Sequence, residues 1–169
     1  MNSEWFGDSF DIVKRFFVAV LQGAGYRVYM NAMFTGRWNG KKKVFHRFVG
    51  ASTPSPNALL SKEKSALLID PDTGIGKIES PKRVTVETIV RNLEHHDIVF
   101  SFDQSFSRNR APLDQMKEKL EILSKNGALG FYYDSHARFL FAAKSPTIIC
   151  AVRDAILATG LPQKRLITK

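Results

Sequence analysis

The sequence contains a series of short apolar runs that each end at an aspartate. Three such runs end at Asp70, Asp103 and Asp134, and segments with helical spacing of apolar residues lie between them. Strands that alternate with helices in this way predict βαβ units and a largely parallel sheet. Right-handed crossovers would bring the carboxyl ends of the parallel strands to one edge, where open α/β sheets bind ligands. The sequence therefore predicts an α/β fold with acidic groups gathered at one sheet edge.

The expected elements follow from hydrophobic spacing and from capping and turn residues. Helices are expected at 8–21, 85–93, 112–125 and 146–159. Strands are expected at 26–34, 66–69, 98–102, 129–133 and 138–143, with the last two antiparallel and a further short edge strand within 161–169. This order predicts a Rossmann-like three-layer sandwich whose sheet is mostly parallel, with an antiparallel edge strand.

A length of 169 residues with 44% hydrophobic residues predicts one α/β domain over 1–169. Within it, a basic and aromatic loop or hairpin is expected at about 36–50, around Asn39 and Gly40, because Asn-Gly is a strong turn signal. A proline-containing connection is expected at 52–57. No run approaches the roughly 20 apolar residues of a membrane-spanning helix, and no signal-type leader is visible. We therefore expect a cytoplasmic protein without a membrane partner.

The formal net charge of +9 predicts an acidic partner, of which nucleic acid is the commonest. The alternative is that the excess lysine and arginine only keep the chain in solution. The segment RWNGKKKVFHRF at 37–48 combines basic side chains, which bind phosphates, with rings that could stack on bases. The candidate nucleic-acid-binding residues are Arg37, Trp38, Lys41, Lys42, Lys43, Arg47 and Arg108.

The acidic edge predicts a site for a hard metal ion, because clustered carboxylates need a cation and oxygen ligands suit Mg²⁺ or Mn²⁺. The candidate metal ligands are Asp70, Asp72, Asp103 and Asp134. A bound metal could orient a phosphodiester and activate water, with Asp70 and Asp103 as catalytic residues and His136 as general acid or base. The alternative is structural, because aspartates at strand ends often form turns or cap the next helix.

The run LLIDPDTG at 67–74 resembles motif IV of Rossmann-fold amino-methyltransferases, in which an apolar strand ends in an Asp-Pro-Pro-Tyr tetrad that holds the target amine. Asp70 and Pro71 match this tetrad, whereas Asp72 and Thr73 replace the second proline and the aromatic residue. The order of elements over 66–143 also resembles the second half of that fold. This resemblance implies S-adenosylmethionine as the cofactor.

The same run also resembles the Asp-x-Asp motif of haloacid-dehalogenase-type phosphatases. That resemblance implies Asp70 as nucleophile and Asp72 as acid, with Ser101 and Asp134 in the remaining positions. The overall pattern further resembles a prokaryotic family that supplies no activity to carry over.

The acidic strand ends and the basic, aromatic segment together predict a metal-dependent phosphoester hydrolase that acts on nucleic acid, most simply a nuclease. One alternative is a methyltransferase-like Rossmann protein. Another is a non-enzymatic nucleic-acid-binding or protein-binding module, which would bind in a salt-dependent way without needing the aspartates.

Overall fold

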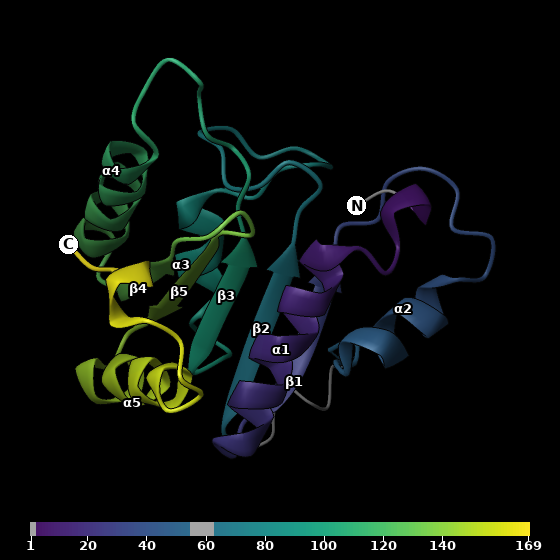
Figure 1. Ribbon diagram of the computed structural model, residues 1–169, viewed down its shortest axis with the longest axis horizontal. Helices are drawn as coiled ribbons and strands as arrows, with labels where there is room; N and C mark the ends of the chain where they lie inside the picture. The colour runs from purple at the N-terminus through teal and green to yellow at the C-terminus, as the bar shows by residue number, and fades with distance from the viewer. Residues whose placement is uncertain (1–2, 55–62) are drawn as a thin grey trace.

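The computed structural model describes residues 3–54 and 63–169 (Figure 1). The helices in these ranges are α1 (Ser9–Gly23), α2 (Lys42–Val49), α3 (Val86–Asn92), α4 (Pro112–Lys125) and α5 (Pro146–Leu157). The strands are β1 (Arg27–Ala32), β2 (Ser65–Asp70), β3 (Ile98–Phe102), β4 (Leu129–Tyr133), β5 (Phe139–Ala143) and β6 (Leu166–Ile167). Short 3₁₀ turns lie at Ser3–Trp5 and Gln163–Arg165. The predicted α/β class is confirmed.

The six strands form one open sheet in the order β1-β2-β3-β5-β4-β6. Strands β1, β2 and β3 are parallel, whereas β5 is antiparallel to both of its neighbours and β6 is antiparallel to β4. The sheet is therefore mixed, which corrects the prediction of a mostly parallel sheet, although the edge strand β6 is antiparallel to its neighbour as expected. A short turn at residues 134–138 makes β5 run opposite to β4. The sequence shows this reversal but not that β5 returns to the inside of the sheet, next to β3.

Side chains along the strands alternate between two apolar clusters, one on each face of the sheet. On β3, for example, Phe100 belongs to one cluster and Val99 to the other. Helices α1, α2 and α5 cover the first face, which we call the α1 face, and α3 and α4 cover the second, the α4 face. The central strands are thus buried on both sides, which explains why they read as continuous apolar runs.

The predicted helix starts are confirmed where a capping residue signals them. Asp8 caps α1, because its Oδ1 accepts hydrogen bonds from the backbone N–H groups of Phe10 at 2.9 Å and Asp11 at 3.1 Å. Thr85 caps α3 in the same way, and Pro112 lies in the first turn of α4.

Residues 42–49 form helix α2, which corrects the prediction of a loop or hairpin at 36–50. Asn39 and Gly40 do form a turn, with φ angles of 38° and 78°, but this turn leads into a helix rather than a second strand. Phe45 and Val49 lie four positions apart, are 0% exposed and face the α1 cluster. The connection expected at 52–57 lies partly outside the described residues, which include only its first part up to Pro54.

None of the helices in the described ranges has the length and apolar character needed to cross a membrane.

Candidate functional site

The three strand-end aspartates lie at the same edge of the sheet. Strands β2 and β3 are parallel, and β4 runs in the same direction because two antiparallel pairings separate it from β3. Asp70 ends β2, Asp103 follows β3 and Asp134 follows β4. The side chains, however, do not converge.

The register between β2 and β3 sends Asp70 and Asp103 to opposite faces of the sheet. Ile69 pairs with Ser101, so Asp70 lies level with Phe102 and Asp103 lies one position further along. Because consecutive residues of a strand point to opposite faces, this offset of one residue separates the two carboxylates. Asp70 contacts α1, and Asp103 contacts α4.

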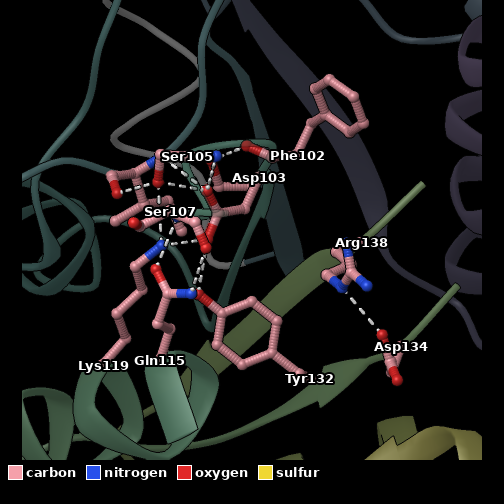
Figure 2. Close-up of polar contacts among 11 residues, drawn as sticks. Phe102, Asp103, Ser105, Ser107, Gln115, Lys119, Tyr132, Asp134 and Arg138 are labelled. Atoms are coloured by element: carbon pink, nitrogen blue, oxygen red, sulfur yellow. Dashed lines mark hydrogen bonds and ion pairs between the residues drawn. The ribbon is translucent and has the colours of Figure 1, made fainter. Parts of the chain in front are cut away.

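Asp103 is the centre of a buried polar network (Figure 2). Its Oδ1 accepts hydrogen bonds from the Ile75 backbone N–H at 2.9 Å, the Ser105 backbone N–H at 3.0 Å and the Ser105 hydroxyl at 2.7 Å. Its Oδ2 accepts from Lys119 Nζ at 2.6 Å and from the Tyr132 hydroxyl at 2.8 Å. Burial and the adjacent Asp103 carboxylate raise the pKa of the Tyr132 hydroxyl well above its ordinary value. Both carboxylate oxygens thus accept hydrogen bonds that connect the loops after β2 and β3 to helix α4 and strand β4.

Gly74 makes room for this network. It adopts a φ of +94°, and a Cβ at this position would collide with Asp103 Oδ1 and lie 2.5 Å from the Gln104 backbone nitrogen. Glycine is the residue that tolerates both the positive φ and the close approach. The glycine in the sequence DPDTG therefore has a packing role in the Asp103 network.

A cleft of about 700 Å³ lies beside this network, between the loops that follow β2 and β3 and helix α4. Its charged lining residues are Lys77, Arg83, Glu87, Arg110, Glu118 and Lys119. Arg110 pairs with Glu118 at 2.8 Å, whereas Lys77 forms no ion pair with a described residue. The cleft therefore carries a small excess of positive charge.

A second buried cluster, which we call the Lys14 triad, consists of Asp11, Lys14 and Asp70. Lys14 Nζ lies 2.8 Å from Asp11 Oδ1 and 3.0 Å from Asp70 Oδ1, and the three residues are at most 3% exposed. Asp11 Oδ2 also accepts a hydrogen bond from the Gly7 backbone N–H at 2.8 Å. Neither oxygen of Asp70 accepts a hydrogen bond from a described residue. One lysine thus faces two carboxylates, and one negative charge is in excess when both are ionised.

Burial and the charges within the triad shift the pKa values of Asp70 and Lys14. Burial raises the pKa of the Asp70 carboxyl, and the nearby Lys14 ammonium only partly offsets this effect. Burial alone would lower the pKa of Lys14, but the carboxylates of Asp70 and Asp11 outweigh it and raise that pKa above its ordinary value. Lys14 therefore stays charged at neutral pH.

Asp134 and His136 lie in the turn between β4 and β5. Asp134 Oδ1 accepts a hydrogen bond from Arg138 Nε at 2.8 Å, apart from the Asp103 network (Figure 2). His136 is exposed, and its Nε2 lies 3.4 Å from the Ser9 hydroxyl. In the described part of the chain, neither residue forms a hydrogen bond or ion pair with Asp70 or Asp103.

The aspartates do not fit the predicted Mg²⁺ or Mn²⁺ site. Each strand-end aspartate pairs with its own basic side chain: Asp70 with Lys14, Asp103 with Lys119 and Asp134 with Arg138. Asp72 accepts a hydrogen bond from the Thr35 hydroxyl at 3.1 Å. Among the described residues, no three or more histidine, cysteine, aspartate or glutamate side chains form a group that could hold a metal ion. The arrangement gives no support to metal-dependent hydrolysis at this edge.

Most of the predicted nucleic-acid-binding residues gather on and before α2. We call Arg37, Lys41, Lys42, Lys43 and Arg47 the basic α2 surface. All five are exposed, and none forms an ion pair with a described residue. Helix α2 contains no acidic residue. Arg108 is also exposed but lies on the loop after β3, a different part of the chain.

Trp38 differs from its basic neighbours. It is 3% exposed, its ring centre lies 4.5 Å from that of Phe34, and its Nε1 donates a hydrogen bond to the Thr35 carbonyl at 3.2 Å. The ring packs in the apolar cluster of the α1 face and is not open for stacking on a base.

Sequence reasoning missed the residues that balance the aspartates. Lys14 lies three positions from both Asp11 and Phe17, on the buried stripe of α1, and this position was the signal of a buried lysine. Lys119 directly precedes the buried Leu120 of α4, but nothing in the sequence connects it with Asp103. Comparisons of the chain with protein-family models, with curated proteins and with solved structures give no significant match, so the interpretation of this site rests on its own geometry.

Proposed function

We propose that the protein binds nucleic acid and that the basic α2 surface holds the phosphate backbone. The observation that carries this proposal is the segregation of residues around α2. Its basic side chains are exposed without acidic neighbours on the helix, while Phe45 and Val49 anchor the other side in the core. Because the helix is already held in place by its buried side chains, little backbone entropy is lost when its basic residues bind phosphates.

Three basic residues that contact the strand-end aspartates are less suited to this role. Lys14, Lys119 and Arg138 each already pair with one of these aspartates. The residues of the basic α2 surface have no such partner in the described chain, so phosphates can serve as their counter-ions. Binding would release the cations condensed on the nucleic acid and would weaken as salt increases.

We further propose that a Rossmann-like layering supports this surface, with the sheet between the α1 face and the α4 face. The methyltransferase-like alternative predicts that S-adenosylmethionine binds, and calorimetric titration with that compound tests it. Absence of heat would remove this alternative.

The main experiment measures binding of labelled duplex DNA and single-stranded RNA by fluorescence anisotropy at several salt concentrations. The test variant combines Lys41→Gln, Lys43→Gln and Arg47→Gln. The control combines Arg91→Gln, Lys117→Gln and Lys125→Gln, which removes the same charge from exposed positions on α3 and α4. Helices α2 and α4 lie toward opposite ends of the long axis (Figure 1).

We expect the test variant to bind at least about ten-fold more weakly, with a slope of log affinity against log salt reduced by about one per lost phosphate contact. The control should keep most of the affinity. Equal losses in both variants, or no binding by the unchanged protein, would contradict the proposal. Cleavage of the labelled strands in Mg²⁺ or Mn²⁺ that is lost in Asp70→Asn and Asp103→Asn would instead support the metal-dependent hydrolase.

A further inference from the structure

A cavity of about 420 Å³ lies at the carboxyl end of β2, next to the first turns of α1. This volume is within the range of small-molecule sites. Its wall contains four carboxylates, Asp8, Asp11, Asp70 and Asp72, and one basic side chain, Lys14. The cavity is thus acidic in a protein whose formal net charge is +9. Its field favours a cationic ligand.

Three of the four carboxylates already have hydrogen-bond donors. Asp8 caps α1, Asp11 accepts from Lys14 and Gly7, and Asp72 accepts from Thr35. Asp70 is different, because it is 1% exposed and neither of its oxygens accepts a hydrogen bond from a described residue. Buried polar atoms in folded proteins nearly always have such a partner. The ion pair with Lys14 reaches Oδ1, so Oδ2 is the atom that needs a donor.

Aromatic rings form much of the remaining wall. Phe10 and Phe102 line the cavity, and Trp5, which also lines it, is 66% exposed. Ring faces attract ammonium groups, and Lys14 Nζ already lies 5.1 Å from the centre of the Phe102 ring. Rings supply no oxygen ligands, whereas Mg²⁺ and Ca²⁺ each need about six or more. One unpaired carboxylate oxygen among rings therefore suits an organic cation rather than a metal ion.

We propose that this cavity binds a small alkylammonium ion, whose N–H group donates to Asp70 and whose carbon chain packs against Phe10 and Phe102. The ion supplies both the missing hydrogen-bond donor and the positive charge that the Lys14 triad lacks. This binding is separate from the basic α2 surface and does not depend on nucleic-acid binding.

Isothermal titration calorimetry of the full chain at pH 7 tests the proposal. The probe is 1,4-diaminobutane, and the matched neutral control is butane-1,4-diol, which has the same length and no charge. A third titration uses MgCl₂ alone. We expect heat of binding for the diamine and none for the diol or Mg²⁺. No binding of the diamine, or equal binding of the diol, would overturn the proposal.

Variants then locate the site. Asp70→Asn keeps the size of the side chain but removes its charge, and Trp5→Ala removes an exposed ring of the wall. We expect Asp70→Asn to weaken diamine binding at least about ten-fold, a loss typical of a buried charged hydrogen bond. Trp5→Ala should weaken it about two- to five-fold, a loss typical of an exposed cation–π contact. Asp114→Asn, at an exposed position on α4, should leave binding unchanged.

Diamine binding that survives in folded Asp70→Asn would overturn the proposal, and so would Mg²⁺ binding that is lost in that variant. Circular dichroism checks the fold of each variant. If Asp70→Asn does not fold, Trp5→Ala decides, because unchanged affinity in that variant excludes this cavity.

Discussion

Lys14 is the buried cation that balances the carboxylates of Asp11 and Asp70. Its ammonium group lies between two buried carboxylates and within 5.8 Å of the ring centres of Phe45 and Phe102. A buried ion pair gives little net stability, but the loss of one partner is costly because it leaves an uncompensated buried charge. The two kinds of residue in the Lys14 triad should therefore respond differently to substitution.

Lys14→Met should lower the free energy of unfolding by about 3–5 kcal/mol at pH 7, because two buried carboxylates lose their cation. Urea denaturation measures the change. Lys117→Met, at an exposed position on α4, is the control and should stay within about 0.5 kcal/mol.

Asp70→Asn should cost less than Lys14→Met, because it leaves one lysine facing one carboxylate. Burial raises the pKa of Asp70, so the folded protein holds this proton more tightly than the unfolded chain does. The wild type therefore loses stability as the pH rises above the ordinary carboxyl pKa, and Asp70→Asn lacks this contribution. Equal losses in Asp70→Asn and Lys14→Met would contradict the assigned charge balance.

Gly74→Ala should destabilise the protein by about 2–5 kcal/mol, since it combines left-handed backbone strain with overpacking against Asp103. Gly127 offers a matched control, because it has a φ of +78° but no atom within 4 Å of an added Cβ. Gly127→Ala should cost only about 1–2 kcal/mol, the backbone strain alone, in the same denaturation measurement. Similar losses at both positions would show that the contact with Asp103 is unimportant.

At the scale of elements, the pairing of β2 with β3 decides which face each strand-end aspartate reaches. The order and type of most elements could be predicted, because the runs at 98–102, 112–125 and 129–133 carry strong periodicity and clear end signals. The register between parallel strands has no comparable local signal. A shift of one residue would have placed Asp70 and Asp103 on the same face, so the acidic edge could be predicted while the separation of its side chains could not.

Helix α2 is not predicted from the sequence, because the Asn-Gly turn signal is given more weight than the helical spacing of the apolar residues that follow it. The Asn-Gly pair at 39–40 favours a turn, and it does form one. Phe45, Phe48 and Val49 have the spacing of a helix face, which a hairpin interpretation ignores. The same spacing directs the basic residues outward, so the candidate nucleic-acid surface could be identified before its shape was known.

Phe45→Ala should lower the free energy of unfolding by about 3–5 kcal/mol, because Phe45 is fully buried beneath α2. Val44 directly precedes Phe45 but is 47% exposed, so Val44→Ala should change stability by less than about 1 kcal/mol. Thermal or urea unfolding distinguishes the two. Equal effects would contradict the helical orientation that exposes the basic α2 surface.

At the scale of the whole molecule, one histidine links global stability to pH. His96 is 6% exposed, and the hydroxyl of Ser65 lies 3.0 Å from its Nδ1. Burial lowers the pKa of His96, and the neighbouring His95 adds to this effect. The unfolded chain binds the proton near the ordinary pKa of about 6.5, so the folded state loses stability as the pH falls through that value.

Urea unfolding at pH 7.5 and 5.5 measures this dependence. The fall in the free energy of unfolding toward pH 5.5 should be smaller in His96→Gln than in the wild type. His95→Gln is the matched control, because His95 is adjacent and exposed, and it should retain most of the fall. An unchanged dependence in His96→Gln would rule out this histidine as its source.

We expect the two buried charge networks to be thermodynamically independent, because the one-residue offset between β2 and β3 places them on opposite faces of the sheet. The Lys14 triad and the Asp103 network share no residue and lie on opposite faces of the sheet. Losses of stability in Asp70→Asn and Tyr132→Phe should therefore add in the double variant to within about 0.5 kcal/mol, whereas a coupling above about 1 kcal/mol would contradict this. If the losses are additive, a substitution on one face of the sheet needs no compensating substitution on the other. The cavity beside the Lys14 triad and the cleft beside the Asp103 network could then change their ligands independently during evolution.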